Sequence, residues 1–65
     1  MNPEKQMEKL IEKARREWKE NWTRGMMEFD PTYNQITVWV CREDVYKAFF
    51  DAETLIHIHT KYSRC

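Results

Sequence analysis

Two histidines and a cysteine are the residues of this chain whose types could do chemistry. His57 and His59 are separated by one residue, and Cys41 ends the uncharged run Ile36–Cys41. On a strand, both imidazoles would point to one side of a sheet, where they could meet the thiol of Cys41 on a neighbouring strand. Imidazole and thiolate are ligands of Zn²⁺ and Cu²⁺, and a cysteine beside a histidine can also act as a nucleophile.

The sequence nevertheless favours neither a metal site nor an enzyme. A single His-x-His is more often two polar residues on an exposed strand, and no clear fourth ligand or second cysteine pair accompanies it. No third residue that would orient a catalytic histidine can be identified. We therefore expect no cofactor, no catalytic activity and no metal bound by Cys41, His57 and His59.

A tryptophan near the centre of a sheet face is the second feature. Trp39 would share its face with side chains of both charges, and a large aromatic residue ringed by polar groups is typical of an interface hot spot. The predicted partner-binding residues are Trp39, His57, His59, Lys61, Glu28 and Asp30. The alternative is that a helix or neighbouring side chains cover Trp39, which would make it part of the core.

The element that must position these residues is the run Ile36–Cys41. It is rich in β-branched and aromatic residues and apolar on both faces, which predicts a strand in the middle of a small sheet. Before it, Met26–Asp30 alternates in polarity, and Asp30–Asn34 contains the residue types that favour turns. Together these segments predict an antiparallel hairpin with a loop of four or five residues.

The N-terminal stretch predicts an amphipathic helix. Asn2 is a favoured N-cap residue, and Pro3 fits the first helical position. Apolar residues then recur at steps of three and four, and the helix is expected to end near Thr23, with Gly25 as its stop. The stripe that would face the sheet consists of Met7, Leu10, Ile11, Ala14, Trp18, Asn21 and Trp22.

Two further elements complete the predicted order. Val45, Phe49 and Ala52 recur at helical steps, which predicts a second helix over about 43–52. Residues 55–63 alternate in polarity and predict a last, half-buried strand. The face of that strand expected to be buried carries Ile56, Ile58, Thr60 and Tyr62.

These elements predict an α+β fold, a small two-layer sandwich of order α-β-β-α-β. Its three-stranded mixed sheet would carry both helices on one face. The connection before the last strand is long enough for a right-handed crossover, so this strand is expected to run parallel to the central one. A chain of 65 residues is expected to form one domain, residues 1–65.

Composition narrows the classes of function. The net charge is zero, whereas nucleic-acid-binding proteins usually carry a positive surplus. No apolar run approaches the ~20 residues of a membrane-spanning helix. Two cysteines are too few for a disulfide framework, and free thiols predict the reducing environment of the cytoplasm.

We therefore expect a small cytoplasmic protein-interaction module without catalytic activity. It would be a phage- or mobile-element-type inhibitor that occupies a surface of a larger protein complex, and a second copy of the chain is another candidate partner. One alternative is a designed mini-protein scaffold without a natural partner, which the first helix, rich in Glu, Lys and Arg, favours. Another is a weak nucleic-acid-binding or metal-binding domain.

Overall fold

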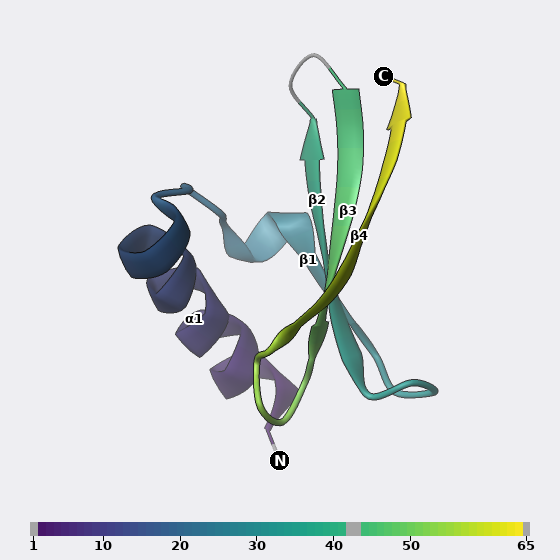
Figure 1. The fold of residues 1–65 in the computed structure, drawn as a ribbon. Coiled ribbons are helices and arrows are strands. Elements are labelled where there is room, and N and C mark those ends of the chain that lie inside the picture. Colours follow the sequence, from purple (N-terminus) through teal and green to yellow (C-terminus); the bar gives the residue numbers. More distant parts are fainter. Residues whose placement is uncertain (1, 42–43, 65) are drawn as a thin grey trace.

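The chain folds into one helical stretch packed against a four-stranded antiparallel sheet, an α+β arrangement (Figure 1). This computed structural model describes residues 2–41 and 44–64. Helix α1 (Pro3–Lys13) continues directly into the π-helical turn η1 (Ala14–Trp18), and a short 3-10 turn, η2 (Arg24–Met26), leads into the sheet. The α+β class is confirmed, and the predicted order α-β-β-α-β is wrong.

The start of α1 follows the predicted capping chemistry. The side-chain oxygen of Asn2 accepts a hydrogen bond of 3.0 Å from the backbone N–H of Glu4, and Pro3 occupies the first turn, where no intrahelical N–H is needed. One face of the helix then buries Met7, Leu10 and Ile11. The N-terminal helix is thus confirmed, with its apolar face toward the core.

The helical stretch ends earlier than the predicted Thr23. Lys19 adopts the left-handed conformation, with φ 54° and ψ 32°, directly after Trp18. Lys19 closes the wide π turn. The backbone N–H groups of Lys19 and Glu20 both donate to the carbonyl of Ala14. The chain then extends, and Trp22 reaches the core from this extended segment and not from a helix.

The sheet is a simple meander in which each strand pairs with its neighbours in sequence. Its order is β1-β2-β3-β4, and all three pairings are antiparallel. The strands are β1 (Met27–Asp30), β2 (Gln35–Cys41), β3 (Asp44–Asp51) and β4 (His57–Arg64). The predicted β1–β2 hairpin and the interior position of β2 are confirmed, but the three-stranded mixed sheet is wrong.

The segment predicted as a second helix is strand β3. Its side chains alternate, with Tyr46, Ala48 and Phe50 toward α1 and Val45, Lys47 and Phe49 away from it. Because apolar residues occupy both faces, some of them also fall at helical spacing, and this coincidence misled the prediction. Glu43, within the predicted helix, lies outside the described residues.

The last strand is also placed differently from the prediction. A tight turn after Asp51 replaces the crossover, so β4 runs antiparallel to β3 and forms an edge of the sheet. A β-bulge between the pairs Phe49–His59 and Phe50–His57 adds one residue, Ile58, to β4. The face of β4 predicted to be buried is largely exposed, because the single helix does not reach it.

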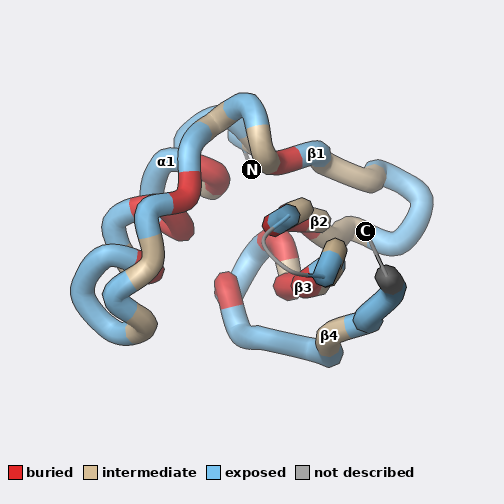
Figure 2. The backbone as a smooth tube through the Cα atoms, turned by 90° about the horizontal axis from the view of Figure 1, so that it is seen from above, coloured by how far each residue is buried: buried red, intermediate tan, exposed pale blue. Residues whose placement is uncertain are grey.

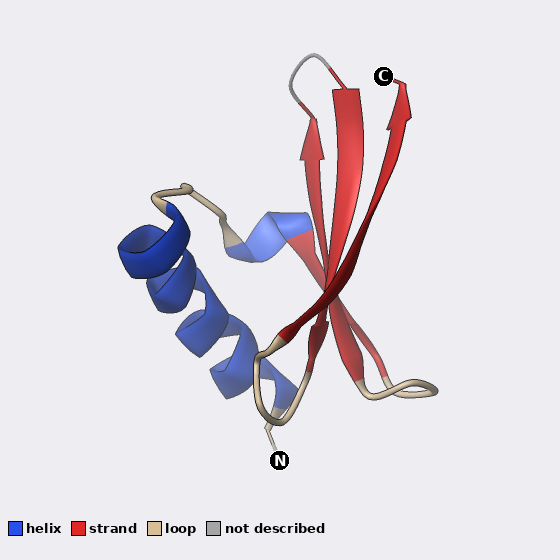
Figure 3. Ribbon diagram, viewed as in Figure 1, coloured by secondary structure: helices blue, strands red, loops and turns tan. Residues whose placement is uncertain are grey.

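The core lies between α1 and one face of the sheet, which we call the inner face (Figures 2 and 3). The rings of Trp18, Trp22 and Phe50 form a cluster, with centroids 5.2 to 5.5 Å apart. This cluster joins the end of the helical stretch to β3. Around it pack the other buried residues, including Met7, Leu10, Ile11, Ala14, Met27, Ile36, Val38, Val40, Ala48, Ala52 and Leu55.

Candidate functional site

The sheet face that points away from α1, which we call the outer face, carries most of the predicted partner-binding residues. Directly paired residues of antiparallel strands share a face, so the register assigns its members row by row. The described residues place no helix on this side of the sheet (Figures 1 and 2). Its rows are Asp30–Gln35–Asp51, Glu28–Thr37–Phe49–His59, Trp39–Lys47–Lys61 and Cys41–Val45–Ser63.

Trp39 lies in a row with two lysines. Trp39 pairs with Lys47, and Lys47 pairs with Lys61 on the next strand. The ammonium of Lys47 lies 5.9 Å from the centroid of the Trp39 ring, a cation–π distance. Trp39 is half-buried, so its indole is neither fully in water nor part of the core. The alternative of a second helix over Trp39 is wrong.

A second row places aromatic rings beside Trp39. Phe49 and His59 stack, with ring centroids 4.4 Å apart and an interplanar angle of 17°. Glu28 and Thr37 complete this row toward β1. Flat rings and aliphatic stems therefore form the middle of the outer face, where a partner could bury them.

Carboxylates occupy one end of the outer face. Asp30 and Asp51 both pair with Gln35. Hydrogen bonds from the backbone N–H groups of Thr54 and Glu53 to the Asp51 carboxylate hold its pKa below the ordinary value of 3.8. The outer face thus has an acidic end at Asp30 and Asp51 and a basic row at Lys47 and Lys61.

The bulge separates the two histidines. His59 is on the outer face, whereas His57 pairs with Phe50 on the inner face. The His57 ring lies 5.2 Å from that of Phe50, and its Nε2 forms a hydrogen bond of 2.7 Å with the hydroxyl of Thr60. The one extra residue reverses the side to which His57 points, so its place in the predicted binding face is wrong.

The residues considered for metal binding are not brought together. Cys41 lies two rows from His59 on the outer face, about 13 Å along the strand direction, and His57 is on the other side of the sheet. Cys41 is also disulfide-bonded, so its sulfur is not available as a thiolate. Among the residues that the structure describes, no group of three His, Cys, Asp or Glu side chains could hold a metal ion.

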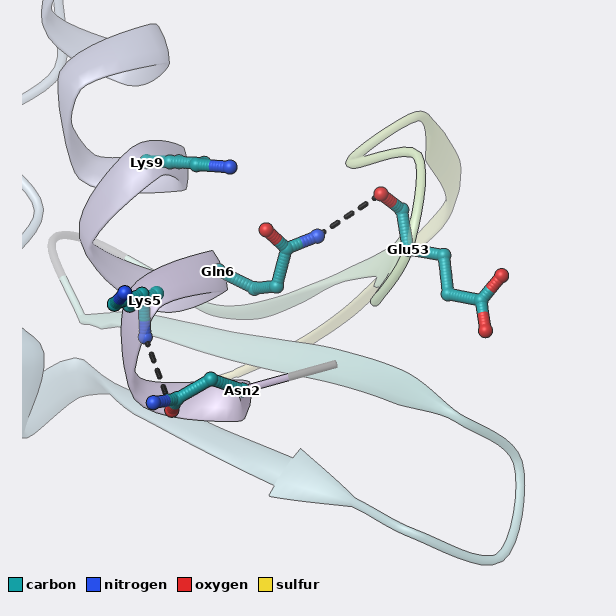
Figure 4. A pocket seen from close by; sticks show the side chains of 5 residues that line it. All are labelled: Asn2, Lys5, Gln6, Lys9 and Glu53. Atoms are coloured by element: carbon teal, nitrogen blue, oxygen red, sulfur yellow. Dashed lines mark hydrogen bonds between the residues drawn. The ribbon is translucent and has the colours of Figure 1, made fainter.

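Among the hollows that described residues line, two border the helix, and these two do not involve the outer face. One, of about 340 Å³, lies at the start of α1, between Asn2, Lys5, Gln6, Lys9 and Glu53 (Figure 4). There the Gln6 side-chain amide donates to the carbonyls of Ala52 and Glu53, at 2.6 and 2.9 Å. These bonds connect the helix to the β3–β4 turn. Gln6, the side chain at the centre of this hollow, therefore has a structural role.

The second hollow, of about 190 Å³, lies where the aromatic cluster meets β4. His57 and Thr60 form its β4 side, and Glu20, from the extended segment after the helical stretch, also lines it. The remaining lining residues are Trp18, Trp22, Tyr46, Ala48 and Phe50. Most of these side chains belong to the core or pack against it.

Sequence reasoning missed the outer-face residues of β3, which are Val45, Lys47, Phe49 and Asp51. All four lie in the segment that was predicted as a helix. The alternation Val45, Lys47, Phe49 on one side and Tyr46, Ala48, Phe50 on the other was the signal that could have identified them. The enrichment of this segment in valine, tyrosine and phenylalanine also favours a strand.

Comparison of the chain with protein-family models, with curated proteins and with solved structures gave no significant match. In the described part of the chain, no helix is long and apolar enough to cross a membrane.

Proposed function

We propose that this protein is a non-catalytic interaction module that binds another protein through the outer face of its sheet. The observation that carries the proposal is the row Trp39–Lys47–Lys61. Like charges directly opposite each other destabilise a sheet. A carboxylate of a partner placed over Lys47 and Lys61 would offset this repulsion, while the partner buries the exposed part of Trp39.

The charge distribution of the face favours a protein over a nucleic acid. Phosphates would be attracted by Lys47 and Lys61 but repelled by Asp30 and Asp51 at the other end of the face. A protein surface can present carboxylates to the lysines and cations to the aspartates. Complementarity of this kind fixes the orientation of a partner and raises the rate of association.

Inhibition by occupancy is the activity we assign to such a module. A rigid sheet face that covers a functional surface of a larger protein complex blocks that surface without any chemical step. The sequence argument for the cytoplasm assumed free thiols. That assumption is wrong for Cys41, which is disulfide-bonded, and disulfides are typical of oxidising compartments, so we do not extend the proposal to a location.

The experiment is capture of partners from a lysate, followed by calorimetry with the purified partner. Trp39→Ala should keep the fold, because Trp39 is only half-buried, and should weaken binding by about 2 kcal/mol or more, the usual size for a hot spot. Binding should also weaken as salt rises, because the lysine contacts are screened.

The matched control is Lys9→Ala, which removes an exposed lysine from the helical side of the molecule. This variant should bind like the parent. Equal affinity of Trp39→Ala and the parent would refute the proposed face. Loss of binding after nuclease treatment would point to a nucleic acid instead.

A further inference from the structure

Strand β4 leaves one edge of the sheet open. Within residues 2–41 and 44–64 it pairs with β3 alone, and it is longer than the other edge strand, β1. Of the four large apolar side chains that the described residues leave exposed, three lie on β4 or just before it: Ile56 at 61%, Ile58 at 46% and Tyr62 at 72%. An exposed apolar edge strand is a template for pairing with another strand.

We propose that β4 pairs antiparallel with β4 of a second copy of this chain, about a two-fold axis at Thr60. In this register Thr60 faces Thr60 of the second copy. Ile58 then faces Tyr62 of the second copy, and Tyr62 faces Ile58, all on the inner side of the sheet. The pairing is self-complementary, as a two-fold interface requires, and it covers two side chains per copy that water now reaches.

Charge selects this register over its neighbours. A two-fold axis one residue later would place Lys61 directly opposite Lys61 of the second copy, a destabilising pair. An axis one residue earlier would place the two His59 rings opposite each other and leave the Ile58–Tyr62 contact unformed. With the axis at Thr60, Lys61 faces His59 of the second copy.

The geometry of β4 leaves room for this pairing. The bulge lies at Ile58, near the N-terminal end of β4, and residues 59–63 keep a regular register with β3. An axis perpendicular to the sheet keeps both helices on the inner side, and α1 does not cover the exposed Ile58 and Tyr62. The dimer would join the two four-stranded sheets into one and bring both outer faces side by side.

The test is sedimentation equilibrium of the parent and of two double variants over a range of concentrations. The parent should approach twice its chain mass of 8.1 kDa. Ile58→Lys with Tyr62→Lys sets like charges opposite each other across the axis and should raise the dissociation constant at least about tenfold. Ile58→Glu with Tyr62→Lys sets opposite charges there and should keep the dimer.

Two controls complete the design. Tyr33→Lys changes the fourth exposed apolar side chain, in the β1–β2 loop, and should leave the dimer unchanged. Hydrogen exchange of the unmodified parent should show β4 amides that are protected at high concentration and exchange faster on dilution. A parent that remains at its chain mass at every concentration, or equal association of the two double variants, would overturn the proposal. Trp39→Ala should not change the dimer, because Trp39 lies on β2 and not on β4. The β4 pairing and the outer-face binding site can therefore be refuted separately.

Discussion

At the scale of single residues, Asp51 connects the acidic end of the outer face to the turn that reverses the chain. Its carboxylate accepts hydrogen bonds of 2.8 and 2.9 Å from the backbone N–H groups of Glu53 and Thr54. In the same turn Leu55 adopts a positive φ of 62° while its side chain is buried. An aliphatic residue is unfavourable in this conformation, so the bonds to Asp51 help to hold a turn that the backbone alone would resist.

The first stability prediction concerns Asp51→Ala and its dependence on pH. Because the pKa of Asp51 is lower in the folded protein than its ordinary 3.8, its stabilising effect is complete above that value and is lost as pH falls through the folded pKa. The unfolding temperature of Asp51→Ala should therefore lie below that of the parent near neutral pH. The difference should shrink in acid well below 3.8.

Asp51→Asn is the control. Both bonds go to one oxygen of Asp51, so the amide oxygen of asparagine can still accept them, but the amide does not titrate. Its difference from the parent should be smaller near neutral pH. A gap between Asp51→Ala and the parent that is equally large in acid would contradict the role of the carboxylate. Both measurements need only thermal unfolding curves at several pH values.

At the scale of elements, the end of the helical stretch decides where the two tryptophans go. The π turn Ala14–Trp18 and the left-handed Lys19 stop the helix before Trp22. Trp18 and Trp22 then meet Phe50 together, although only one of them lies on a helix. A regular helix through Thr23 would have carried Trp22 on its own surface, one turn beyond Trp18.

Lys19 offers a test of this helix end. A residue with a side chain costs roughly 1–2 kcal/mol in the left-handed conformation, and glycine avoids that cost but loses more entropy on folding. Lys19→Gly should therefore raise the free energy of unfolding by about 0.5–1 kcal/mol. Lys9→Gly, inside α1, should lower it by about 1 kcal/mol. Urea unfolding of both variants checks the pair, and a Lys19→Gly variant that loses as much stability as Lys9→Gly would refute the proposed strain.

The sequence predicts the helix start, the first hairpin and the interior position of β2, because each depends on local signals. Asn2 and Pro3 are capping residues, and Asp30 begins a turn by accepting a hydrogen bond from the N–H of Thr32. For β3, the apolar residues fitted both helical and strand spacing. The choice between the two depends on the tertiary fold, in which one face of β3 packs against α1 and the other does not.

The candidate site was predicted only in part, because local signals identify some of its residues and not others. Trp39, Lys61, His59, Glu28 and Asp30 share the outer face as expected. His57 does not, because no sequence pattern marks the extra residue of a bulge. Lys47, which lies opposite Lys61, could be identified only after β3 was known to be a strand.

At the scale of the whole molecule, one aromatic ring links the helix to the sheet. Phe50 is 1% exposed and contacts both Trp18 and Trp22. An isolated helix as short as α1 is marginal in water, so its stability depends on this packing. We therefore expect helix and sheet to unfold in a single transition.

Adjacent phenylalanines test this coupling. Phe50→Ala should cost about 3–5 kcal/mol, and a domain of this length is stabilised by only about 3–10 kcal/mol in total. Phe49→Ala, on the half-buried outer face, should cost about 1 kcal/mol. Circular dichroism in the far and near ultraviolet should show Phe50→Ala losing helix and aromatic packing together. A folded Phe50→Ala variant as stable as Phe49→Ala would contradict the assignment of the core.

The strand order also has a kinetic consequence. Every strand pairs with the one before or after it in the chain, so each pairing closes only a short loop, and the entropy lost at each step is small. Hairpins of this kind form in roughly 1–10 μs. The contacts between Trp22 or α1 and β3 span a much longer stretch of chain, and chains whose contacts are mostly local fold faster than those that depend on distant ones. We therefore expect the meander to form early and the docking of the helical stretch to limit the folding rate.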